Sequence, residues 1–108
     1  MAPQLADPLA ALSSPRRREI LRLVWTDEKS AGDIAGAFEV SWPAISQNLR
    51  VLKAAGLIKE RRLGTSRLYR ADRGALKPLE PYLRGMWTRN IDRLLLAAEA
   101  EERGKSKR

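Results

Sequence analysis

The apolar positions of the chain recur mostly at the three- and four-residue spacing of amphipathic helices, and Pro, Gly and Ser residues separate the segments. A short first helix is predicted over residues 5–12. Ser14 as a side-chain cap and Pro15 in the first helical position predict a second helix that reaches about Trp25. In this helix the apolar side chains are expected to face the core: Ile20, Leu21, Val24 and Trp25. The arginines are expected to point largely outward: Arg16, Arg17, Arg18 and Arg22.

Two further helices follow, separated by a tight connection. Ser30 is the predicted cap of the first, which has Asp33 in its first turn and an apolar face of Ile34, Ala35 and Phe38. Ser41 caps the second, with Pro43 in its first turn, and Gly56 ends it. A core stripe runs along this second helix at Ile45, Leu49 and Leu52.

Segments 57–63 and 67–71 flank a turn of Gly64, Thr65 and Ser66, which predicts a β-hairpin. The hairpin tip is basic and polar, and is therefore expected in solvent. After it, Pro78 and Pro81 stand near the start of one long final helix. Its apolar stripe needs a partner surface, either a second copy of the chain or the same domain: Leu79, Leu83, Met86, Trp87, Ile91, Leu94, Leu95 and Ala98.

With 108 residues, the chain has room for a single domain, expected over residues 1–100, and residues 101–108 are expected to form a basic, disordered tail. The sequence contains no Cys and no His, so the usual zinc, iron–sulfur and thiol chemistries are excluded. The longest apolar run, Leu94 to Ala98, is too short for a membrane span, and no secretory signal is recognisable. We expect a cytoplasmic protein without cofactor or metal.

The net charge of +8 and the pI near 10.6 favour a nucleic-acid partner over a merely soluble protein with a basic surface. Two short helices followed by a basic hairpin predict a mostly α-helical winged helix-turn-helix with a small β-hairpin. In the major groove, Gln47 suits adenine, Ser46 is less selective, and Ala44 suits a thymine methyl. Phosphate contacts are expected from Arg50 and Lys53. The complete expected DNA-binding set is Ser41, Trp42, Ala44, Ser46, Gln47, Arg50, Lys53, Arg61, Arg62 and Arg67.

From about Leu5 to Ala98, the sequence resembles the ArsR-type (arsenic-repressor-like) transcriptional regulators. The resemblance rests on Leu5–Pro8, Pro15–Leu21, Asp33–Ala35 and, most specifically, Ser41–Leu57. It implies a homodimer that binds an inverted-repeat double-stranded DNA operator, usually as a repressor, with dimer contacts from the first and last helices. The implied interface comprises Leu5, Leu9, Leu12, Leu83, Trp87, Ile91, Leu94, Leu95 and Ala98.

The sequence departs from the metal-sensing members of that family. Ser30 and Gly32 stand where those members carry a Cys pair, and the last helix offers only acids such as Asp92 and Glu99. The segment from Trp87 to Leu94 is similar to a metal-independent branch, whose members often repress their own genes. An effector, small molecule or protein, is not identified by the sequence.

Two other functions compete with this interpretation. The second helix of the pair, which begins near Ser41, is the one expected to read the bases and is called the reading helix. An exposed Trp42 at its start is also typical of a winged helix that contacts a protein partner. An enzyme is not expected, because the available acids and bases, carboxylates, lysines, Tyr69 and Tyr82, form no triad or paired-carboxylate pattern.

Overall fold

The structure is a computed structural model that describes residues 7–106, with side chains for residues 7–102. Within this range the chain forms seven α-helices, one 3-10 turn and a three-stranded sheet. In chain order the elements are α1 (Pro8–Ala11), α2 (Pro15–Leu23), β1 (Lys29–Ser30), α3 (Ala31–Gly36), α4 (Trp42–Ala54), β2 (Ile58–Leu63), β3 (Ser66–Ala71), α5 (Arg73–Leu76), η1 (Lys77–Leu79), α6 (Glu80–Thr88) and α7 (Ile91–Ser106).

Local capping fixes where the N-terminal helices begin. The Ser14 hydroxyl accepts a hydrogen bond from the Arg17 amide at 3.3 Å, and the Ser30 hydroxyl accepts one from the Asp33 amide at 3.0 Å. Asp7, which precedes α1, accepts from the Leu9 amide at 3.0 Å. These contacts satisfy amides that have no partner inside the first helical turn, and the expected helix starts at Ser14 and Ser30 are confirmed.

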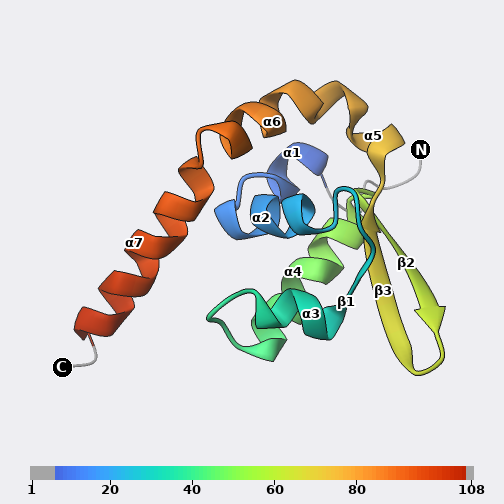
Figure 1. Ribbon diagram of the computed structural model, residues 1–108. Coiled ribbons are helices and arrows are strands. Elements are labelled where there is room, and N and C mark those ends of the chain that lie inside the picture. Colours follow the sequence, from blue (N-terminus) through green and yellow to red (C-terminus); the bar gives the residue numbers. More distant parts are fainter. Residues whose placement is uncertain (1–6, 107–108) are drawn as a thin grey trace.

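The helix-turn-helix consists of α3 and α4, and the wing consists of β2 and β3. Ser41 caps α4, and Gly56 follows the helix with φ of 77°, in the left-handed region that glycine adopts without strain. Strands β2 and β3 pair antiparallel around the turn, with Arg62 opposite Arg67. Figure 1 shows the N-terminal end of α4 and the tip of the wing toward one side of the molecule, with α5 and α6 at the opposite end.

The sheet has a third strand that the apolar pattern did not predict. Strand β1 pairs with β3 through Lys29 opposite Tyr69 and Ser30 opposite Leu68, which gives the order β1-β3-β2. A two-residue strand is too short to show any alternation of polar and apolar residues, so only its pairing partner reveals it. The predicted fold class, a mostly helical winged helix-turn-helix, is confirmed with a sheet one strand larger.

The core lies between α2, α3, α4, the sheet and α6. Its buried members include the four apolar residues expected from α2 and the three of the α4 stripe: Ile20, Leu21, Val24, Trp25, Ile45, Leu49 and Leu52. Arg18 corrects the expectation that the arginines of α2 point outward. Its side chain is buried because it makes an ion pair with Asp92 of α7, which is itself 1% exposed.

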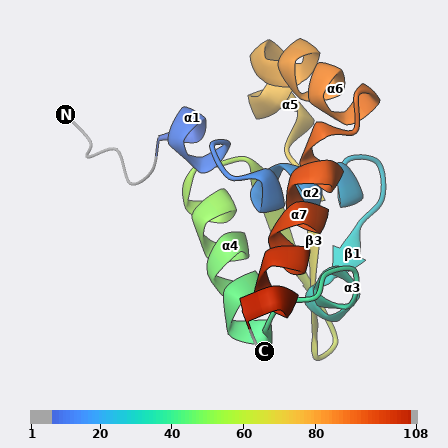
Figure 2. The ribbon, with the colours of Figure 1, turned by 90° about the vertical axis from the view of Figure 1, so that its left-hand side faces the viewer.

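The expected single final helix is broken into separate pieces. Asn90 has φ of 59° between α6 and α7, a left-handed conformation that Asn tolerates and that ends α6. Helix α7 then continues through Ser106, so it extends beyond the predicted end near Ala100 into the segment expected to be a tail. It packs along α2, and Figure 2 shows it in front of that helix. Among residues 7–106, no helix has both the length and the apolar composition to cross a bilayer.

Candidate nucleic-acid interface

Helix α4 presents a polar face to solvent while its apolar stripe anchors it. Burial of Ile45, Leu49 and Leu52 fixes the rotation of the helix about its axis, which sets the face that points outward. Trp42 is 55% exposed at the first position. The other expected reading residues are exposed or half-buried along the same helix: Ala44, Ser46, Gln47, Arg50 and Lys53. Ser41 is exposed, but its hydroxyl already accepts a hydrogen bond from the Ala44 amide at 3.3 Å.

Gln47 and Arg50 act together on this face. The Arg50 guanidinium donates a hydrogen bond from Nη1 to Oε1 of Gln47 at 2.7 Å. The amide oxygen of Gln47 has two lone pairs, and this contact occupies one of them. A bidentate contact with adenine would use the second lone pair together with the amide nitrogen.

A hollow of about 210 Å³ separates α4 from the wing, and Glu60 of β2 lies in it. The Glu60 carboxylate accepts from Lys53 Nζ at 2.6 Å and contacts Arg67 Nη1 at 3.3 Å. The hydrogen bond from Lys53 lowers the pKa of Glu60, and the nearby charge of Arg67 lowers it further. An ionised Glu60 therefore ties a residue of the reading helix to a residue of the wing.

The wing is tied to the rest of the domain by a second ion pair. Arg61 donates from Nε and Nη2 to the two carboxylate oxygens of Glu28, at 2.6 and 2.8 Å. This bidentate contact lowers the pKa of Glu28 and raises the pKa of Arg61. Arg61, Arg62 and Arg67 are all exposed on the wing.

Glu28 and Glu60 are site residues that the sequence interpretation missed. Both are acids beside basic residues, and the available signal was Glu60 standing alone among Lys59, Arg61 and Arg62. Around them, α4 and the wing expose mostly polar and basic residues, with Trp42 and Leu63 as exposed apolar members. Such a surface matches a groove of double-stranded DNA and its flanking phosphates.

The residues expected at a dimer interface divide into two groups. Leu12 and Leu83 lie in the core of the same chain, and Trp87 packs edge-on against Trp25 with ring centroids 5.1 Å apart. These side chains are held by the chain's own fold, whereas a surface is open at Leu9, Leu94, Leu95 and Ala98, with Ile91 half-buried. Leu5 lies outside the described residues.

The positions compared with family metal sites have other partners. The Ser30 hydroxyl caps α3, Asp92 pairs with Arg18, and Glu99 contacts Arg16 at 3.4 Å. Across the part of the chain that the structure describes, no three His, Cys, Asp or Glu residues cluster as metal ligands.

Comparison with known proteins links this geometry to transcription regulators. Residues 14–60, from the α2 cap into β2, match the bacterial regulatory protein arsR family. The HTH-type transcriptional regulator Rv2034 of Mycobacterium tuberculosis is 39% identical over 81 residues, 75% of this chain and 76% of that protein. The transcriptional repressor SdpR of Bacillus subtilis is 46% identical over 54 residues, 50% of this chain and 60% of that protein.

A solved structure has the same fold. The homodimeric winged helix-turn-helix DNA-binding domain of Mb0332 from Mycobacterium bovis is 32% identical, with a TM-score of 0.64 over 73% of each chain. Residues 14–60, the segment that matches the arsR family, contain the whole of α3 and α4. This chain thus belongs to the arsR family, whose members are DNA-binding transcription regulators and not enzymes.

Proposed function

We propose that this protein is a metal-independent repressor that binds an inverted-repeat DNA operator as a homodimer. The observation that carries the proposal is the position of the exposed polar face of α4 beside the basic wing, on one side of the molecule (Figure 1). Both elements can therefore meet the same duplex, with α4 in the major groove and the wing along the backbone.

The contacts divide between base reading and phosphate binding. Ala44, Ser46 and Gln47 occupy the first half of α4, the end that enters the groove in helix-turn-helix proteins. Phosphate contacts come from the cations at and beyond the middle of α4 and on the wing: Arg50, Lys53, Arg61, Arg62 and Arg67. These contacts set affinity and register, whereas the first group sets sequence preference.

The dimer uses the outer face of α7. Leu94 is 65% exposed and Leu95 is 47% exposed, and Ala98 lies one turn further along the same helix. Burial of such a face in a symmetric interface removes apolar surface from water. The homodimeric state of the Mb0332 domain supports this assembly, in which two reading helices would stand roughly 34 Å apart.

Metal independence is supported by the roles of the residues at the family's ligand positions. Ser30 is engaged as a helix cap, and Asp92 is committed to a buried ion pair with Arg18. Release of Asp92 to a metal ion would leave the Arg18 charge buried without a partner. The SdpR comparison supports repression, and the segment from Trp87 to Leu94 supports repression of the chain's own gene.

Fluorescence anisotropy tests the proposal. The purified full chain is titrated into labelled duplexes, at about 150 mM salt, a concentration that screens weak surface contacts. One duplex holds the DNA upstream of its own gene, and the other is a scrambled control. We expect preferential binding of two chains per site that a chelator does not change.

Variants distinguish base reading from protein contact. Gln47→Ala combined with Arg50→Ala is expected to abolish the preference for the operator while dimerisation persists. Arg84→Ala on α6, far from α4, is the matched control. Unchanged operator binding in the double variant would refute the assigned reading residues. If both duplexes bind equally and weakly, the exposed Trp42 becomes the candidate contact for a protein partner, and the repressor proposal fails.

A further inference from the structure

A second cavity lies on the side of the molecule away from the wing. It is open to solvent, is lined by α2, the connection between α3 and α4, and α7, and has a volume of about 560 Å³. Figure 2 shows this side, with α7 in front of α2. The volume falls in the range of roughly 300 to 1,000 Å³ typical of small-molecule sites. None of the residues assigned to DNA contact lines this cavity.

The cavity walls combine apolar surface with guanidinium groups. Leu23, Phe38 and Leu96 supply apolar side chains from three different elements. Arg16, Arg22 and Arg93 supply positive charge, against the carboxylates Glu19 and Glu39. Glu19 holds Arg22 at 3.0 Å and Arg93 at 3.4 Å through the same oxygen. The three cations exceed the two carboxylates of the lining by one positive charge. Arg16 is the cation of the lining that does not pair with Glu19.

Arg16 has an incompletely used hydrogen-bonding edge. Its side chain is 17% exposed, its Nη2 lies 3.4 Å from Glu99, and its buried Nε has no hydrogen-bond partner among the described residues. Two other arginines of this protein show what that edge prefers: Arg18 and Arg61 each bind a carboxylate through Nε and Nη2, at 2.6–2.8 Å. A planar carboxylate is the group that fits this edge.

We propose that this cavity binds a small organic acid, with its carboxylate on the Nε and Nη2 edge of Arg16 and its apolar body against Leu23, Phe38 and Leu96. The guanidinium turns its edge toward the cavity on binding, because Nε is buried in the unliganded chain. This turn exchanges the 3.4 Å contact between Nη2 and Glu99 for the carboxylate of the ligand. The ligand satisfies an orphan donor and covers apolar surface at once, which are the two features that drive binding in such pockets.

The position of the cavity connects this ligand to the reading helix through the contact between Arg16 and Phe38. The Arg16 guanidinium lies over the Phe38 ring, 6.0 Å from its centroid, and Phe38 lies in the connection just before Ser41, the cap of α4. Rotation of Arg16 changes what Phe38 packs against. The site goes beyond the repressor assignment and does not depend on it, because ligand binding is measured without DNA.

Isothermal titration calorimetry with octanoate, kept below its micelle concentration, tests the site. Octanoate supplies a carboxylate on an apolar chain, and 1-octanol supplies the same chain without the charge. We expect saturable binding of one octanoate per chain, at least tenfold tighter than 1-octanol. Arg16→Gln should weaken octanoate binding at least tenfold, and Arg84→Gln should leave it unchanged. The absence of saturable binding, or equal binding to Arg16→Gln, would overturn the proposal.

A cavity-filling variant provides an independent check. Ala97 lines the cavity from α7, and Ala97→Phe places a ring in it. We expect this variant to lose octanoate binding while its thermal unfolding, followed by circular dichroism, and its dimer mass, from sedimentation, stay unchanged. Loss of the dimer in a folded Ala97→Phe would overturn the proposal, since the cavity would then hold the partner protomer. If Ala97→Phe does not fold, the Arg16→Gln titration decides.

Discussion

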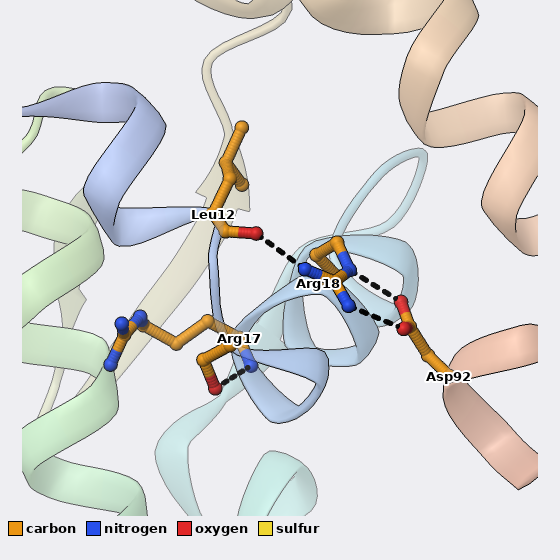
Figure 3. Close-up of polar contacts among 5 residues, drawn as sticks. Leu12, Arg17, Arg18 and Asp92 are labelled. Atoms are coloured by element: carbon orange, nitrogen blue, oxygen red, sulfur yellow. Dashed lines mark hydrogen bonds and ion pairs between the residues drawn. The ribbon is translucent and has the colours of Figure 1, made fainter. Parts of the chain in front are cut away.

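Arg18 and Asp92 form a bidentate ion pair inside the protein, 74 positions apart in sequence. Arg18 Nε and Nη2 donate to the two carboxylate oxygens at 2.8 and 2.7 Å, and Nη1 donates to the Leu12 carbonyl at 2.6 Å (Figure 3). The hydrogen bonds to Asp92 raise the pKa of Arg18. One guanidinium thus joins the end of α1, the helix α2 and the start of α7.

Removal of one partner of this pair should destabilise the fold strongly. Asp92→Ala leaves the Arg18 charge buried, and we expect the free energy of unfolding to fall by about 3 to 5 kcal/mol. Urea denaturation at fixed protein concentration measures the change. The double variant Arg18→Met with Asp92→Leu is the control, expected to recover most of the loss because no charge remains buried. A loss in Asp92→Ala below about 1 kcal/mol, as for a surface pair, would contradict this prediction.

The exposed leucines of α7 should control the oligomeric state. Leu94→Glu with Leu95→Glu places two charges on the proposed interface, so we expect monomers at concentrations where the unmodified chain is dimeric. Both side chains are exposed in the single chain, and the secondary structure should therefore remain. Sedimentation equilibrium measures the mass. The exposed loop substitution Thr26→Glu should leave the dimer intact, and a dimeric double variant would exclude this face.

Glu60 should lower the affinity for DNA, because its carboxylate offsets part of the positive charge of Lys53 and Arg67. Glu60→Gln releases Lys53 and Arg67, so we expect tighter binding to operator and scrambled duplexes alike. The slope of log affinity against log salt should also steepen by about one. Anisotropy titrations over a series of salt concentrations measure both effects. Glu102→Gln, an exposed change on α7, is the matched control. Weaker binding by Glu60→Gln would show that positioning by Glu60 outweighs its charge.

The unmodified protein should show a steep salt dependence. If the dimer contacts about eight phosphates, the slope of log affinity against log salt is expected near −7. The same anisotropy experiment provides this value. A slope near zero would contradict phosphate binding by the wing and α4.

Stability should be nearly independent of pH between about 5 and 8, because His is absent from the sequence and the shifted carboxylates titrate lower. The pKa values of Glu28 and Glu60 lie below their usual 4.5 because of Arg61 and Lys53 respectively. The contribution of each of these ion pairs to the stability of the fold is therefore fully present above pH 4.5. It is lost as the pH falls through the lowered pKa that the carboxylate has in the folded protein. Urea midpoints should agree at pH 7 and 5 and fall at pH 3, whereas a large change between pH 5 and 8 would contradict the assignment.

Local signals in the sequence predicted most of the fold. Ser14, Ser30 and Ser41 each cap a helix by accepting from the amide three positions on, so a few neighbouring residues specify these helix starts. Burial of Arg18 depends on Asp92 of another helix, and β1 depends on β3. No local pattern contains such information, because the partner is distant in the chain.

The candidate site was predictable to the same extent. The exposure of Gln47 and Arg50 follows from the apolar period of α4, which fixes the opposite face. The roles of Glu28 and Glu60 required the folded arrangement, since each contacts a cation on a different element. Leu12 and Leu83 are buried, as the apolar stripes predict. Periodicity alone does not distinguish a side chain buried in the core of its own chain from one buried against a partner protomer.

The left-handed Asn90 sets the direction in which α7 leaves the domain. A helix of 16 residues is about 24 Å long, so a tilt of about 10° at this joint would displace its far end by about 4 Å. In a dimer held together through α7, that tilt would shift the partner's reading helix relative to the neighbouring major groove. In that proposed dimer, the backbone torsion of a single residue would set the spacing between the two half-sites.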